Sequence, residues 1–154
     1  MQIKQTTLLL DNGRPYLEYS DTDMYVYEEN KMDDDDKVYE IAKGIKIDQL
    51  GQERVYAFWM DTAFHLLSIT MISQGTIDRS LMPERETCQI ALLAGAVSAI
   101  LVHNHPSGDP EPSDIDIAIT KKIKESLQMV GIKLVDHIVV GKNRYQSLLK
   151  MGYM

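Results

Sequence analysis

The sequence VSAILVHNHPSGDPEPSDID, from Val97 to Asp116, decides the fold predicted for this chain of 154 residues. Its opening run, Val97–Val102, is almost entirely apolar and has the length of a β-strand that is buried on both faces. A loop rich in Pro and Gly follows, from Pro106 to Pro112. Ser113 then begins a helix, so the stretch predicts a strand, a loop and a helix in succession.

The segment that follows continues this alternation. The helix from Ser113 carries an apolar stripe at helical spacing, and Gly131 is expected to end it. Lys133–Val140 alternates as a strand, and after the turn at 141–143 we expect a last short helix over Tyr145–Leu149. The stripe consists of Ile115, Ile119, Ile123, Leu127 and Val130.

Upstream of the central stretch, the pattern predicts further strands and helices. Val38–Ile47 has its apolar residues on one helical face, and Pro83–Ala94 has acidic residues in its first turn, where a helix favours them. Arg54–Met60 and Phe64–Ile72 are rich in aromatic and β-branched residues and read as an antiparallel pair of strands. Strands that alternate with helices predict an α/β domain, with a mixed β-sheet flanked by helices.

The first part of the chain has a different composition. Thr6–Leu10 and Pro15–Tyr19 flank an Asn-Gly pair, which favours a small hairpin. Ser20–Lys37 is acidic and lacks an apolar rhythm, so we expect a solvated linker that is partly disordered. The predicted organisation is therefore a hairpin and linker over residues 1–37 and a domain over residues 38–154.

Charge and composition exclude several classes of function. The formal net charge is −7, which argues against tight binding of nucleic acid through its phosphates. Lys121, Lys122 and Lys124 are expected to form a solvated helix face. Cys88 is the single cysteine, so no intrachain disulfide can form, and the apolar stretch Ile90–Val102 is shorter than a membrane span of about 20 residues. With no cleavable apolar leader in view, we expect a cytoplasmic protein without a membrane partner.

A pattern of metal ligands follows the central strand. His103 and His105 are two residues apart on extended chain, so their side chains project to the same face. The loop then reverses the chain, and Asp116 comes one turn into the next helix. Two imidazoles and one carboxylate suit Zn²⁺ and leave a fourth position for water, as in catalytic sites.

Each part of this pattern also has an ordinary structural interpretation. A His-x-His pair alone is more often structural or exposed than metal-binding. Ser113 with Asp116 three residues later matches a helix capping box. The combination of two histidines at a strand end, a tight loop and an acid at a helix start favours metal binding.

The stretch from His103 to Asp116, HNHPSGDPEPSDID, resembles the JAMM metalloprotease motif in the RadC-like branch of the JAB domain family. Ser73-x-Gly75-Thr76, Pro83–Glu86 and Asp136–Gly141 are also similar to that branch, and the resemblance covers residues 38–154. It implies a JAB/MPN-like, cytidine-deaminase-like architecture. The helix-hairpin-helix region that precedes this domain in full-length RadC-like proteins has no evident counterpart here.

The resemblance also implies roles for particular residues. It makes His103, His105 and Asp116 ligands of Zn²⁺ and Ser113 the serine that helps to hold a developing oxyanion. The family's general base is a glutamate just before a core strand, and Glu53 matches that place. The competing acids Glu84 and Glu86 are explained by their position at a helix start.

The leading functional hypothesis is a zinc-dependent hydrolase, a metallopeptidase or isopeptidase that acts on a peptide or isopeptide bond. One alternative is a DNA-repair-associated nuclease or accessory DNA-binding factor, which the net charge does not support. Another is a metal-stabilised interaction module without turnover. Among the remaining residues, His137 is expected to be a hydrogen-bonded core histidine and Cys88 a buried apolar residue, and His65 is given no role for want of an acidic partner.

Overall fold

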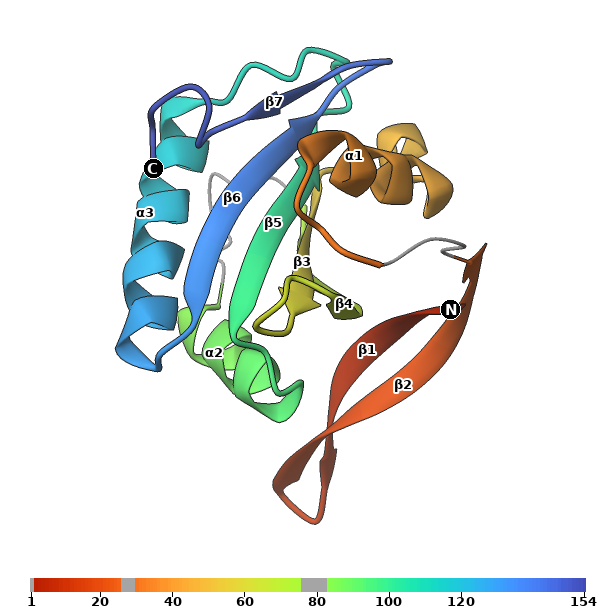
Figure 1. Ribbon diagram of the computed structural model, residues 1–154, viewed down its shortest axis with the longest axis vertical. Helices are drawn as coiled ribbons and strands as arrows, with labels where there is room; N and C mark the ends of the chain where they lie inside the picture. Colours follow the sequence, from red (N-terminus) through yellow and green to blue (C-terminus); the bar gives the residue numbers. More distant parts are fainter. Residues whose placement is uncertain (1, 26–29, 76–82) are drawn as a thin grey trace.

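The computed structural model describes residues 2–25, 30–75 and 83–154. Within these residues one mixed sheet carries seven strands in the order β2-β1-β4-β3-β5-β6-β7 (Figure 1). The strands are β1 (Gln2–Asp11), β2 (Arg14–Tyr25), β3 (Arg54–Met60), β4 (Leu66–Gln74), β5 (Ser98–Asn104), β6 (Lys133–Val140) and β7 (Tyr145–Ser147). The helices are α1 (Asp35–Gly44), the short 3-10 helix η1 (Ile47–Gln49), α2 (Glu84–Leu93) and α3 (Asp114–Met129).

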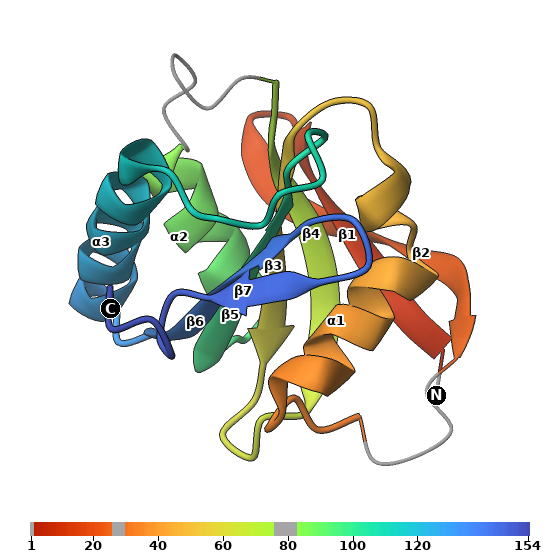
Figure 2. The same cartoon turned by 90° about the horizontal axis from the view of Figure 1, so that it is seen from above.

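The sheet has helices on both faces, as the sequence predicts. Figure 2 shows α2 and α3 together on one side of the strands and α1 on the other. Strand β3 serves both layers because its side chains alternate. Tyr56 and Phe58 pack in the core under α1, whereas Val55 and Trp59 pack in the core with α2 and α3.

Strand β5 is an interior strand of the sheet, and all seven of its residues are buried. It pairs antiparallel with β3 and parallel with β6. Helix α3 makes the crossover between the two parallel strands, which requires a long connection of this kind. The prediction of a strand that is buried on both faces is confirmed, and its carboxyl end opens directly into the loop that precedes α3.

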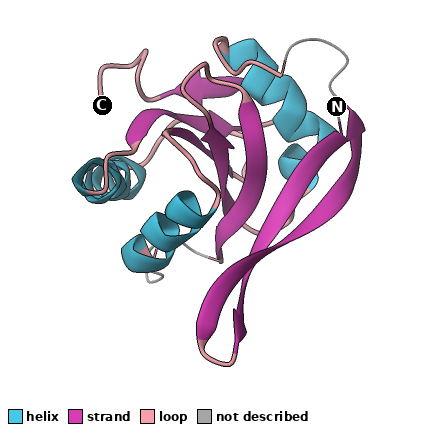
Figure 3. Ribbon diagram, turned by 60° about the horizontal axis from the view of Figure 1, so that its bottom comes forward, coloured by secondary structure: helices cyan, strands magenta, loops and turns pink. Residues whose placement is uncertain are grey.

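The N-terminal hairpin is confirmed, and it is part of the sheet. Asn12 and Gly13 both adopt positive φ, the conformation that joins two twisted strands in a tight turn. The tip of the hairpin extends away from the helices (Figure 3). Its strand β1 pairs in parallel with β4, where the hydroxyls of Thr6 and Thr70 are hydrogen-bonded. The division of the chain at residue 37 stays a prediction.

The predicted acidic linker over Ser20–Lys37 is wrong for the described part of that range. Strand β2 continues to Tyr25, and α1 begins at Asp35. The Asp34 side chain accepts a hydrogen bond from the Asp36 backbone N–H at 3.0 Å and caps the helix. Acidic residues at a helix N-terminus are stabilised by the helix dipole. The negative charges of this run, which would repel one another in an extended chain, are therefore favourable at the start of α1. Residues 26–29 of the predicted linker lie outside the described residues.

Other elements also differ from the sequence prediction in their bounds or in their type. The helix expected over Val38–Ile47 begins at Asp35 and ends at Gly44. The strand expected from Phe64 begins at Leu66, since Phe64 has a positive φ of 66°. The helix expected over Tyr145–Leu149 is wrong, because Tyr145–Ser147 forms strand β7 and pairs with β6. Thr76 of the predicted family motif lies outside the described residues.

A membrane span was not expected from the sequence. Among the described residues, no helix is long and apolar enough to cross a membrane.

Candidate metal centre

The carboxyl end of β5 and the first turn of α3 bring three potential metal ligands together. His103 belongs to β5, His105 follows its last residue, and Asp116 is the third residue of α3. The nitrogen and oxygen atoms that could bind a cation all lie within 4.8 Å of one another. His103 and Asp116 are buried, and His105 is partly exposed. The three residues predicted from the sequence therefore form a single cluster.

The two distances between the carboxylate and the imidazoles match those of a small divalent cation site, whereas the two imidazole nitrogens are closer together than in such a site. The Nε2 atoms of His103 and His105 are 2.9 Å apart. Asp116 places Oδ1 at 3.4 Å from the first of these atoms and Oδ2 at 3.3 Å from the second. Ligands about 2.0–2.1 Å from a tetrahedral zinc ion lie about 3.3–3.4 Å from one another. Among the described residues no fourth His, Cys, Asp or Glu belongs to the group.

The loop after β5 fixes the orientation of His105. Its Nδ1 lies 2.8 Å from the Asp109 backbone carbonyl oxygen, which only accepts hydrogen bonds, so Nδ1 carries the proton. In the neutral form of the ring, the unprotonated Nε2 therefore faces the cluster. The loop itself is docked on the turn after β6, where the Lys142 N–H donates to the Gly108 carbonyl at 2.8 Å. A Cβ atom at Gly141 would lie 2.4 Å from that carbonyl oxygen, so this close approach requires glycine.

The charges of the cluster are strongly coupled. Burial alone would raise the pKa of Asp116, but the two histidines and the Ser113 N–H outweigh it and hold the pKa well below its usual range. The same Asp116 raises the pKa of His105, mainly through their hydrogen bond. Burial lowers the pKa of His137 well below its ordinary value. Without a cation, Asp116 is thus ionised and favours a proton on His105.

Ser113 and Asp116 form the capping box that the spacing allows. The Asp116 N–H donates to Ser113 Oγ at 3.1 Å, and Asp116 Oδ2 accepts from the Ser113 N–H at 2.7 Å. The Ser113 hydroxyl also donates to Asp116 Oδ2, at 2.8 Å. The structural and the metal-binding interpretations are therefore compatible, since the cap holds the carboxylate that faces the histidines. The oxyanion role of Ser113 stays a prediction.

Glu53 comes to the same end of the sheet by strand register. It precedes β3, and β3 runs antiparallel to β5 with Val55 opposite His103. Its charge contributes to the raised pKa of His105, after the larger effects of Asp116 and the Asp109 carbonyl. Glu84, in contrast, is 2.6 Å from Lys122 and accepts a hydrogen bond from Ser126 at 2.5 Å. Of these two acids, Glu53 is the one that acts on the histidine cluster.

Asn104 is a residue of the site that the sequence analysis missed. Its buried side chain accepts from the Arg54 N–H at 2.9 Å and donates to the Leu50 and Gln52 carbonyls at 3.3 and 3.0 Å. These bonds hold both sides of Glu53. The sequence did contain a signal for Asn104. It lies between the two histidines, so on a strand its side chain must face away from theirs.

The predictions for the remaining histidines and for the cysteine have different outcomes. His137 is buried and hydrogen-bonded, as predicted. The prediction that His65 has no acidic partner is wrong, since its Nδ1 lies 3.0 Å from Asp61 Oδ2, a residue four positions earlier across a turn. Cys88 is only partly buried, against the core under α2 and α3.

A mixed sheet with helices on both faces and a His-x-His…Asp cluster at the end of the buried strand β5 defines a JAB-type α/β domain. The family model for the RadC-like JAB domain matches residues 32–153. The chain therefore belongs to the RadC-like JAB domain family, as the resemblance predicted.

Curated relatives agree with this assignment. The UPF0758 protein of Methanococcoides burtonii is 40% identical over 106 residues, which are 69% of this chain and 46% of the relative. That of Desulforamulus reducens is 42% identical over 103 residues, 67% of this chain and 45% of the relative. A UPF0758 protein of Streptococcus agalactiae is 46% identical over 96 residues, 62% of this chain and 42% of the relative. The matched region thus spans less than half the length of these relatives.

Proposed function

We propose that this domain is a zinc-dependent hydrolase that cleaves a peptide or isopeptide bond. The observation that carries the proposal is the convergence of His103 Nε2, His105 Nε2 and the Asp116 carboxylate within 4.8 Å. This donor set suits Zn²⁺, and three protein ligands with an open position are typical of catalytic rather than structural zinc. When bound, the ion would polarise a carbonyl group and make water acidic enough to react near neutral pH.

Glu53 is proposed as the general base. The register of β3 against β5 and its effect on the pKa of His105 support a carboxylate close to the cluster. It would accept a proton from water as the water oxygen attacks the carbonyl carbon. The same proton would pass to the amine nitrogen as the C–N bond breaks, so Glu53 ends the cycle ionised. Proton transfer of this kind contributes about 10²- to 10⁴-fold to a rate.

The surroundings of the cluster favour a peptide over a phosphodiester. The loop between β5 and α3 adds Asp109 and Glu111, and both are exposed. Arg144 lies 3.2 Å from Asp109 and offsets that charge, but Glu111 and Glu53 remain. Negative charge at the mouth of a site repels phosphate, whereas a peptide backbone is neutral. Ser113 is proposed to turn its hydroxyl hydrogen from Asp116 Oδ2 to the carbonyl oxygen as that oxygen gains charge.

The test uses purified protein reloaded with Zn²⁺, and compares wild type with Glu53→Gln and with Glu84→Gln as the matched control. The probes are a fluorogenic peptide panel, an ε-lysyl isopeptide and single- and double-stranded DNA. We expect peptide or isopeptide cleavage in wild type and Glu84→Gln, and a loss of about 10²-fold or more in Glu53→Gln with zinc content unchanged. Cleavage of DNA alone, or full activity of Glu53→Gln, would contradict the proposal.

A further inference from the structure

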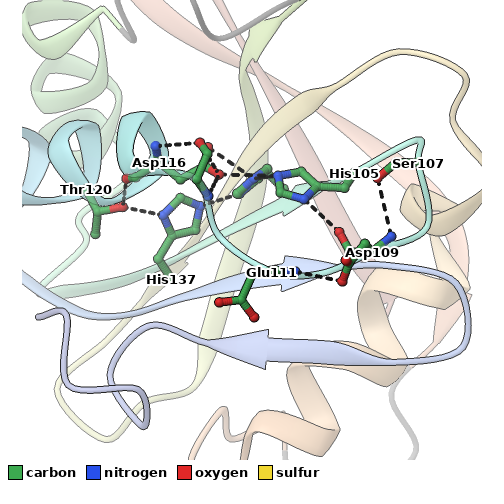
Figure 4. Close-up of polar contacts among 9 residues, drawn as sticks. His105, Ser107, Asp109, Glu111, Asp116, Thr120 and His137 are labelled. Carbon is green, nitrogen blue, oxygen red and sulfur yellow. Dashed lines mark hydrogen bonds and ion pairs between the residues drawn. The ribbon is translucent and has the colours of Figure 1, made fainter.

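Behind the metal centre lies a chain of buried polar groups that the proposed function does not use. His103 Nδ1, on the side of the ring away from the cluster, lies 2.7 Å from His137 Nε2. His137 Nδ1 lies 2.6 Å from the Thr120 hydroxyl oxygen, which in turn lies 2.6 Å from the Asp116 backbone carbonyl oxygen. Figure 4 shows Thr120 and His137 beside Asp116, on the side of the centre formed by α3 and β6. The chain thus begins at one ligand and ends at another.

The direction of every hydrogen bond in this chain follows from its last member. A carbonyl oxygen only accepts, so the single hydroxyl hydrogen of Thr120 points at Asp116. Thr120 then has only lone pairs to offer His137, which must donate from Nδ1. A buried imidazole is neutral and carries one proton, so His137 Nε2 is an acceptor.

The consequence for the ligand is specific. Because His137 Nε2 accepts, His103 must donate from Nδ1, and its Nε2 is left with a free lone pair. That atom is the one that faces His105 and Asp116. In the opposite tautomer the proton would lie on Nε2, where it would block coordination. Thr120 and His137 therefore decide which nitrogen of His103 is available to a cation.

We infer that Thr120 and His137 are positioning residues that hold His103 in the metal-binding tautomer. The inference rests on the metal site of the proposed function and not on hydrolysis. His103, Thr120 and His137 are each at most 1% exposed, so water does not compete for these hydrogen bonds. Partners of this kind typically change metal affinity by about 10- to 100-fold when they are removed.

The experiment measures Zn²⁺ affinity by competition with a chromophoric chelator. Thr120→Val removes the hydroxyl at nearly constant volume, and we expect an affinity about 10- to 100-fold weaker. Thr120→Ser restores the hydroxyl and should bind as wild type does. The matched control is Thr87→Val, because Thr87 is also fully buried and its hydroxyl has no hydrogen-bond partner among the described residues. This control should bind Zn²⁺ as tightly as wild type.

A second measurement does not depend on any variant. Nitrogen-15 NMR of the wild-type protein distinguishes a protonated from an unprotonated imidazole nitrogen, and we expect His137 to carry its proton on Nδ1. A proton on Nε2 of His137, or wild-type affinity in Thr120→Val, would overturn the inference. If wild type binds no Zn²⁺, the proposed function fails, while the NMR result still decides the direction of the chain.

Discussion

Two neighbouring residues of β6, Asp136 and His137, point to opposite faces of the sheet and enter polar clusters of opposite character. Asp136 is 3% exposed, and its carboxylate accepts from three donors: the Ser147 hydroxyl at 2.5 Å, the Leu149 N–H at 3.0 Å and the His137 N–H at 2.6 Å. In the Asp136 cluster, the carboxylate oxygens are thus matched by hydrogen-bond donors from within the chain. On the other face, His137 supports a cluster in which two imidazole nitrogens and a carboxylate turn lone pairs toward one another.

The difference teaches how to separate a structural cluster from a ligand site. A buried acceptor needs a donor, and a group of acceptors without enough donors needs a cation or a proton. The Asp136 cluster is complete within the chain and holds the C-terminal segment on β6. The His103–His105–Asp116 cluster is complete only with an added positive charge, which agrees with the raised pKa of His105 beside Asp116.

The largest expected effect is at the incomplete cluster. Asp116→Asn keeps the shape of the side chain and an oxygen for the Ser113 N–H, so we expect the protein to fold. Zn²⁺ affinity should fall by at least about 100-fold, because complete ligand sets bind with about 10–16 kcal/mol and this change removes the only charged ligand. Calorimetric titration of the metal-free protein measures it. An affinity within tenfold of wild type would mean that Asp116 serves the helix cap alone.

A change in the Asp136 cluster should lower the stability of the protein rather than its affinity for metal. Asp136→Ala leaves the donors of Ser147, Leu149 and His137 without their acceptor, and a buried unpaired group costs about 1–3 kcal/mol. We expect the free energy of unfolding of the metal-free protein to drop by about that amount, with Zn²⁺ affinity of the folded protein changed less than tenfold. Urea denaturation and metal titration together test this. A large loss of affinity at unchanged stability would reverse the contrast between the two faces.

Acidification should weaken metal binding. Asp116 raises the pKa of His105 above the ordinary imidazole value of about 6.5, so in the metal-free protein a proton competes with the cation from a higher pH. Each proton displaced on binding lowers the apparent affinity about tenfold per pH unit below that pKa. We expect Zn²⁺ binding to be strongest above the pKa of His105 and to fall as the pH drops from 7 to 6. Titrations in matched buffers would show no such slope if His105 is not a ligand.

The smallest effect is expected at Glu84, an acid whose charge is already balanced at the surface. Lys122 and Ser126 lower the pKa of Glu84, so its stabilising contribution is present above the unfolded pKa and is lost as the pH falls through the folded value. Surface pairs of this kind contribute about 0–1 kcal/mol. Glu84→Gln should therefore reduce stability by less than about 1 kcal/mol at pH 7, as urea denaturation can measure. A larger loss would indicate that α2 and α3 depend on this pair.

Local chemistry explains the parts of the molecule that the sequence predicted well. The buried strand that ends in His103, the capped helix that begins at Ser113 and the Asn-Gly hairpin are each encoded within a few residues of one another. Two of the predictions that failed involved contacts across longer distances, whereas the missed partner of His65 is only four residues away. Tyr145–Ser147 forms a strand because it pairs with the edge of β6. The acidic run at Asp34–Asp36 begins a helix because the apolar face of that helix packs in the core.

The sequence by itself determined which residue types could bind a metal and that they lie at a strand end and a helix start, because the spacing of side chains along regular structure is fixed by backbone geometry. Only the tertiary structure decided the rest. It brought Glu53 to the same end of the sheet as the histidine cluster through the pairing of β3 with β5, and Thr120 and His137 behind His103 through the packing of α3 on β6. Strand register and helix packing join residues that are distant in sequence, so no local pattern can contain them.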